Sequence, residues 1–101
     1  MTPTGTTPLI VVAKIVALAG AEADVERELR GLVAPTRAED GCLSYDLHRA
    51  VDDQRTFVFT EAWESAEHLA RHGQSAHITA YRERVGDRIE SFDVHRLEKL
   101  G

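Results

Sequence analysis

The chain has 101 residues, which is close to the commonest size of a single domain and long enough to bury a core without disulfides or structural metals. Hydrophobic residues make up 43% and charged residues 29%, and the formal net charge is −5. This acidic balance disfavours nucleic acid and anionic membranes as partners. Cys42 is the only cysteine, which excludes an internal disulfide, and the longest apolar run, Leu9–Ala13, is too short to cross a bilayer.

The first eight residues are rich in Thr, Pro and Gly and lack the basic start and apolar centre of a signal peptide. We expect residues 1–8 to be a disordered tail and residues 9–101 to form one domain, located in the cytoplasm.

The first half of the domain predicts a strand and then a helix. Residues 9–18 are apolar and β-branched on both faces, which is typical of a strand in the centre of a sheet. A helix is expected over residues 21–40, with Pro35 kinking it or ending it early and Gly41 stopping it. The expected buried stripe of this helix has helical spacing and consists of Val25, Leu29, Leu32 and Val33.

Residues 42–49 and 55–64 alternate as two paired strands do, with a polar loop, Asp52–Gln54, between them. One face of the second strand is unusual because it places a carboxylate among three aromatic rings. This face consists of Phe57, Phe59, Glu61 and Trp63.

The last third predicts two helices and a strand. Ser65 and Ser75 are natural N-caps for helices over residues 66–72 and 76–89, and residues 91–97 read as a strand. The expected buried stripe of the second helix consists of Ile78, Tyr81, Val85 and Ile89. The element order predicts an α+β fold of the ferredoxin-like βαββαβ type, an antiparallel sheet with helices on one face.

Such a sheet has a second face, and the hairpin carries too much apolar surface to leave uncovered. The side chains concerned are Leu43, Tyr45, Leu47, Phe57, Phe59 and Trp63. We expect two copies of the chain to pack sheet against sheet around a two-fold axis, forming a dimeric α+β barrel. The alternation alone leaves open which face meets the helices.

The segments Glu39–His48 and Phe57–Trp63, followed by His72 and Ser75–His77, resemble the antibiotic-biosynthesis monooxygenase (ABM) domains of the dimeric α+β barrel superfamily. The small quinol-monooxygenase-like group is the most similar, and the resemblance spans residues 9–97. It implies a homodimer that oxidises quinols, anthrones or related phenolic rings with O2 and without a cofactor. Polyketide-tailoring and haem-degrading members often carry an Asn on the first strand, which this chain lacks, and this disfavours haem degradation.

The resemblance also implies site residues. Trp63 and His72 match a tryptophan and a histidine at the family's pocket, and Tyr45 and Glu61 match positions that line it. The catalytic candidates are therefore His72 and Glu61. The candidates for substrate binding are Trp63, Tyr45, Phe59, His77 and Tyr81.

Each candidate has a functional and a structural interpretation. His72 has the imidazole best suited to remove a phenolic proton near neutral pH, but it could also be a solvated histidine at a helix C-terminus. Trp63 could stack on a substrate ring or pack in the core. Glu61 could be an acid or base with raised proton affinity, or a structural partner of an arginine or a backbone amide. Tyr45 could bind a substrate oxygen or be a core residue.

Two functions from different classes follow. The first is a cofactor-free monooxygenase, with a second copy, a small aromatic substrate and O2 as partners. The alternative is a non-catalytic dimeric module that binds a small molecule, and a haem-binding degrader is a weaker third. No spacing in the sequence indicates a metal site, and His48, His68 and His95 read as solvated.

Overall fold

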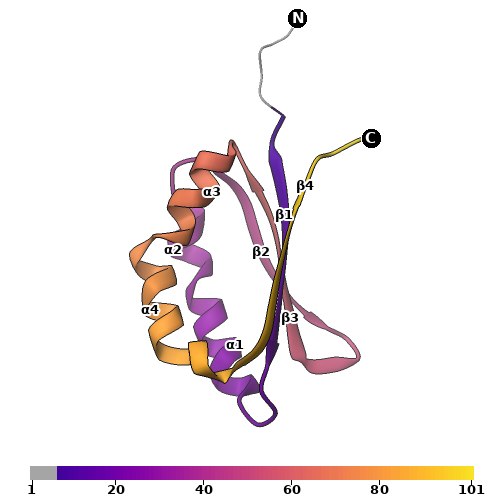
Figure 1. Cartoon of the computed structure of the whole chain (residues 1–101), viewed down its shortest axis with the longest axis vertical. Helices are drawn as coiled ribbons and strands as arrows, with labels where there is room; N and C mark the ends of the chain where they lie inside the picture. The colour runs from indigo at the N-terminus through magenta and orange to yellow at the C-terminus, as the bar shows by residue number, and fades with distance from the viewer. Residues whose placement is uncertain (1–6) are drawn as a thin grey trace, which may run out of the picture.

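The computed structural model describes residues 7–101, in which the elements follow the order βαββαβ with each helical connection divided into two helices (Figure 1). The elements are β1 Leu9–Ala17, α1 Glu22–Gly31, α2 Val33–Arg37, β2 Cys42–Ala50, β3 Asp53–Trp63, α3 Ala66–Gly73, α4 Ala76–Val85, the 3-10 turn η1 Gly86–Arg88, and β4 Ile89–Leu97. The strands form one antiparallel sheet in the order β2-β3-β1-β4, and the helices lie on one face of it. The predicted ferredoxin-like α+β fold is confirmed.

Residues 1–6, which make up most of the predicted tail, lie outside the described residues. The structure describes the predicted domain, residues 9–101, in full. Between residues 7 and 101, none of the helices has the length and apolar character needed to cross a membrane. The cytoplasmic location stays a prediction.

Strand β1 lies in the centre of the sheet, between β3 and β4, as its two apolar faces indicated. Its register places Val11 opposite Glu61 and Ala13 opposite Phe59. Residues directly opposite in an antiparallel pair point to the same face. The pairing therefore sets Glu61 beside apolar side chains of β1.

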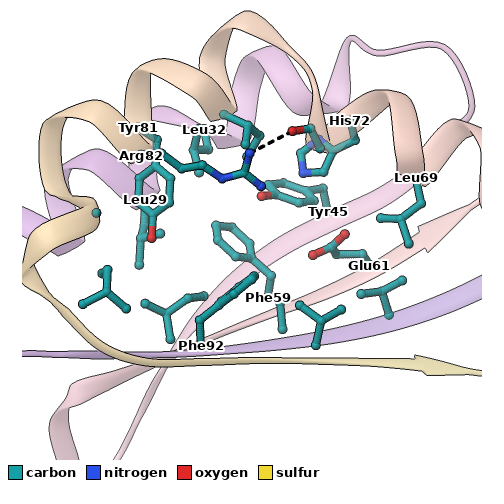
Figure 2. Close-up of a pocket in the computed structure, with 18 residues that line it drawn as sticks. Leu29, Leu32, Tyr45, Phe59, Glu61, Leu69, His72, Tyr81, Arg82 and Phe92 are labelled. Carbon is teal, nitrogen blue, oxygen red and sulfur yellow. Dashed lines mark hydrogen bonds between the residues drawn. The ribbon is translucent and has the colours of Figure 1, made fainter.

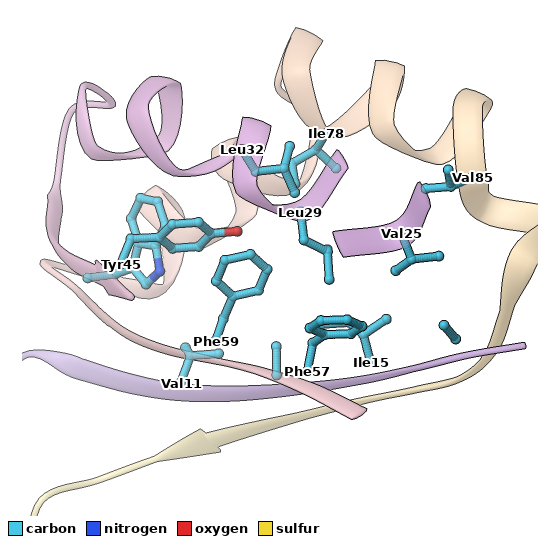
Figure 3. Packing of buried hydrophobic residues seen from close by; sticks show 13 residues of the cluster. Val11, Ile15, Val25, Leu29, Leu32, Tyr45, Phe57, Phe59, Ile78 and Val85 are labelled. Atoms are coloured by element: carbon cyan, nitrogen blue, oxygen red, sulfur yellow. The ribbon is translucent and has the colours of Figure 1, made fainter. Parts of the chain in front are cut away.

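The aromatic face of the hairpin packs against the helices of its own chain (Figure 3). Tyr45, Phe57, Phe59 and Trp63 are each at most 3% exposed and belong to one core with the apolar stripes of α1 and α4. The prediction that a second copy covers this face is therefore wrong. Leu43 does not share the face, because an irregularity in the pairing of β2 follows Cys42 and leaves Leu43 half exposed.

The long helix predicted over residues 21–40 is divided into α1 and α2 at Leu32. Pro35 explains the break, because it has no N–H to donate to the carbonyl of Gly31 four residues earlier. Pro35 is instead tolerated in the first turn of α2, where the N–H of Thr36 donates to the Leu32 carbonyl at 3.1 Å.

Two further boundaries differ from the prediction. Helix α4 ends at Val85, and Ile89, expected in its buried stripe, instead begins β4 and pairs with Ala17. The hairpin loop is also shorter than expected, because Asp53 and Gln54 belong to β3. The Asp53 carboxylate accepts hydrogen bonds from the Arg55 backbone and the Thr56 hydroxyl, which fixes this end of the strand.

Gly41 brings the loop after α2 close to helix α3. Its φ of +82° is unfavourable for residues with a side chain, and a Cβ there would lie 2.1 Å from the Cδ2 atom of His68. The same loop carries Glu39, which hydrogen-bonds to His72 on α3. The close approach at Gly41 therefore helps to position that contact.

We predict that Gly41→Ala lowers the free energy of unfolding by about 1–3 kcal/mol, because it combines an unfavourable φ with a clash against His68. Gly31→Ala is the matched control, since Gly31 lies in α1 with open space around its Cα, and it should change stability by no more than about 1 kcal/mol. Urea unfolding measures both. Equal effects of the two substitutions would contradict this account of the loop.

Candidate active site

A cavity of about 360 Å³ lies between the sheet and the helices (Figure 2). Its volume is within the range of small-molecule sites. Most of its wall is apolar and includes Val11, Ala13, Ile15, Leu29, Leu32, Leu69, Ile78 and Phe92. The polar groups are few and come from β2, β3, α3 and α4: Tyr45, Glu61, His72, Tyr81 and Arg82.

The sheet register assembles one side of the cavity. Tyr45 on β2 lies opposite Glu61 on β3, and its ring stacks on Phe59 with centroids 4.4 Å apart. The Tyr45 ring also lies edge-on to His72, with centroids 5.4 Å apart. Burial raises the pKa of Tyr45 above its ordinary value, and burial raises the pKa of Tyr81 to about 12. Both phenols therefore stay neutral and can donate a hydrogen bond.

Glu61 projects into the cavity among apolar side chains (Figure 2). Burial raises the pKa of its carboxyl, the indole N–H of Trp63 opposes this by donating to Oε1 at 2.8 Å, and the charge of Glu39 adds to the rise. Glu61 therefore holds a proton more readily than a surface glutamate does.

Trp63 and His77 were expected to contact a substrate, but the structure places both outside the lining of the cavity. Trp63 is fully buried beside Glu61, with its ring 4.9 Å from that of His72. His77, near the start of α4, hydrogen-bonds to Glu39. Trp63 therefore supports the lining residue Glu61 directly, and His77 contacts Glu39, which in turn holds the lining residue His72. Tyr45, Phe59 and Tyr81 line the cavity themselves.

His72 lies in the last turn of α3 and is buried in the cavity wall, so the interpretation as a solvated histidine is wrong. Its Nδ1 is 2.7 Å from Oε2 of Glu39. An ionised carboxylate only accepts hydrogen bonds, so Nδ1 carries the hydrogen and Nε2 is left with its lone pair. Burial lowers the pKa of His72, although the bond to Glu39 opposes this, which favours the neutral imidazole.

Sequence reasoning missed the role of Glu39. It lies 33 positions before His72, in the turn between α2 and β2, and no periodic pattern connects the two. The only available signal was that two acidic residues, Glu39 and Asp40, close the helical segment before Gly41. The same oxygen of Glu39 also accepts a hydrogen bond from Nε2 of His77 at 2.7 Å.

Arg82 lines the cavity while it stays exposed on α4, and it donates to the Gly73 carbonyl at the end of α3 (Figure 2). One histidine differs from its sequence interpretation. His68 was expected to be solvated, yet it is half-buried and hydrogen-bonds to the Ser65 hydroxyl at 2.7 Å. His48 and His95 are exposed, as expected.

The fold and the cavity together define a small α+β domain with an apolar cavity between its sheet and its helices. The sequence matches the family model described as "Antibiotic biosynthesis monooxygenase" over residues 8–84. It is 37% identical over 82 residues to "Putative monooxygenase Rv0793" from Mycobacterium tuberculosis (strain ATCC 25618 / H37Rv), covering 81% of this chain and 80% of that protein.

Solved structures agree with this match. The crystal structure of PA3566 from Pseudomonas aeruginosa superposes with a TM-score of 0.93 at 36% identity, covering 98% of this chain and 100% of that one. The structure of Rv0793 gives 0.85 at 34% identity, covering 93% and 96%. The chain belongs to the antibiotic biosynthesis monooxygenase family.

The raised pKa of Glu61 has a consequence for stability. Between the ordinary glutamate pKa of about 4.3 and the raised value, the folded chain keeps a proton that the unfolded chain has lost. The free energy of unfolding contributed by Glu61 therefore falls as pH rises through this window. We predict that Glu61→Gln removes this fall, as measured by urea unfolding at a series of pH values. Identical pH profiles for the two proteins would contradict the prediction.

Proposed function

We propose that this chain is a cofactor-independent monooxygenase that oxidises a quinol, an anthrone or a related electron-rich phenolic ring with O2. The observation that carries the proposal is a neutral imidazole, His72, held by Glu39 in the wall of an apolar cavity. Family membership supports the reaction class, and the flat aromatic lining supports a flat ring as the substrate.

The chemistry needs little from the protein. O2 has a triplet ground state and reacts slowly with closed-shell molecules, but a phenolate can transfer one electron to it. The two radicals then recombine at a ring carbon to give a hydroperoxide, which loses water and leaves a carbonyl group. A base, a pocket that fits the ring and exclusion of bulk water are sufficient for this sequence.

The residues of the cavity supply these parts. Nε2 of His72 takes the phenolic proton, while Glu39 keeps the ring in the reactive tautomer and stabilises the imidazolium that forms. Protonated Glu61 supplies the proton that lets the hydroperoxide lose water. The stacked rings of Tyr45 and Phe59 form a flat wall for the substrate.

We also propose that the active form is a homodimer. Strand β4 is at the edge of the sheet, and Phe92 and Val94 line the cavity although they are 59% and 45% exposed. One chain thus leaves the cavity wall along β4 open to water, which would quench the proposed intermediates. A second copy packed on β4 would close it and cover the exposed apolar side chains of this edge strand.

Oxygen uptake tests the reaction. With simple hydroquinones and anthrones as substrates, the protein should consume O2, and His72→Ala should reduce the rate by about 10²–10⁴-fold, the usual contribution of a general base. His48→Gln is the matched control, because His48 is exposed on the sheet face opposite the helices and should leave the rate unchanged.

Absence of O2 uptake above the no-protein background across these substrates would contradict the proposal. If the His72→Ala and His48→Gln variants both still bind an aromatic ligand without turning it over, the result would favour the non-catalytic binding module.

Sedimentation equilibrium tests the homodimer. At micromolar concentration we expect a mass of about twice 11.2 kDa, and Phe92→Glu should shift the population toward single chains because it places a charge in the proposed contact. A well-ordered single chain of 11.2 kDa as the main wild-type species would contradict it.

A further inference from the structure

We propose that Glu39, His72 and His77 form a binding site for one divalent transition-metal cation, such as Zn²⁺. The ion would lie on the Nδ1 side of His72, and the proposed reaction does not require it. It departs from the sequence expectation that the chain binds no metal.

The geometry suits a metal ion. Nδ1 of His72 and Nε2 of His77 are each 2.7 Å from the same oxygen of Glu39, and the three atoms lie within 4.8 Å of one another. Zn²⁺ takes imidazole nitrogens at about 2.0–2.1 Å and carboxylate oxygens at about 2.0–2.2 Å, so neighbouring ligand atoms in a tetrahedron are roughly 3.3 Å apart. To admit the ion, each of the two nitrogen-to-oxygen distances would have to lengthen by about half an ångström.

The donor set and its surroundings determine the class of ligand. Two imidazoles and one carboxylate form the three-ligand set of open zinc sites and suit transition metals in general, whereas Mg²⁺ and Ca²⁺ prefer oxygen ligands. The side chains of Glu39, His72 and His77 are 16%, 9% and 22% exposed. The site is therefore sheltered from bulk water but still reachable by an ion.

The surrounding structure holds the two histidines in place before any ion binds. Ser75 donates its hydroxyl to the His72 carbonyl at 2.7 Å and caps α4 by accepting from the N–H of Ile78. This fixes the turn between α3 and α4, which sets the positions of both histidines. A bound ion would connect this turn to the loop that carries Glu39.

Metal binding would change the cavity. A metal ion on Nδ1 of His72 needs the lone pair of that nitrogen, so the ring hydrogen moves to Nε2. Nε2–H cannot accept a phenolic proton. The bound ion therefore inhibits turnover, a consequence that rests on the proposed function, whereas the metal site itself does not.

Metal titration of the purified full chain, stripped of metal, tests the site. Zn²⁺ in competition with a chromogenic chelator should bind at one ion per chain, and Co²⁺ should develop a visible absorption that Zn²⁺ abolishes. Glu39→Gln and His77→Ala should each weaken Zn²⁺ binding by at least about tenfold, the smallest loss usual even for residues that only support a ligand. His48→Gln should bind as the wild type does.

A second measurement uses the wild type alone, so it does not depend on whether the variants fold. Zn²⁺ should shift the ring ¹⁵N signals of His72 and His77 and leave those of His48 and His95 in place. Failure to bind Zn²⁺ and Co²⁺ at micromolar concentration, or shifts of His48 and His95 as large as those of His72 and His77, overturns the site. Zn²⁺ binding that leaves turnover unchanged overturns the proposed inhibition but not the metal site. Absence of turnover in the metal-free chain contradicts the proposed function but not the metal site.

Discussion

The carboxylate of Glu39 holds two histidines, and most of the chemistry of the cavity depends on this contact. Hydrogen bonds to charged groups contribute about 1.5–3 kcal/mol each, which helps to offset the burial of His72. The contact also joins three separate parts of the chain, namely the turn before β2, helix α3 and helix α4. It therefore fixes both the position of the His72 ring and the nitrogen that carries its hydrogen.

The sheet contributes the second half of the site. Its register sets Glu61 beside Tyr45 and Val11, so a carboxyl group is surrounded by rings and apolar side chains. Burial shifts the pKa of Glu61 up and that of His72 down, so both groups tend toward their neutral forms. A neutral acid and a neutral base in one cavity are the pair that a proton-transfer reaction at neutral pH needs.

Much of the fold could be predicted from the sequence because its signals are local. The apolar faces of β1, the capping serines Ser65 and Ser75, and the break near Pro35 each depend on residues a few positions apart. The face of the hairpin that meets the helices could not be predicted, because alternation along a strand is the same whichever face is covered. The contact between Glu39 and His72 could not be predicted either, because only the tertiary fold brings these two residues together.

The state of the His72 ring can be read by ¹⁵N NMR of the metal-free protein at neutral pH. We expect a neutral ring with the hydrogen on Nδ1 and an unprotonated Nε2. A ring with its hydrogen on Nε2, or one protonated on both nitrogens, would contradict this expectation, because neither form could accept the proton of a phenol.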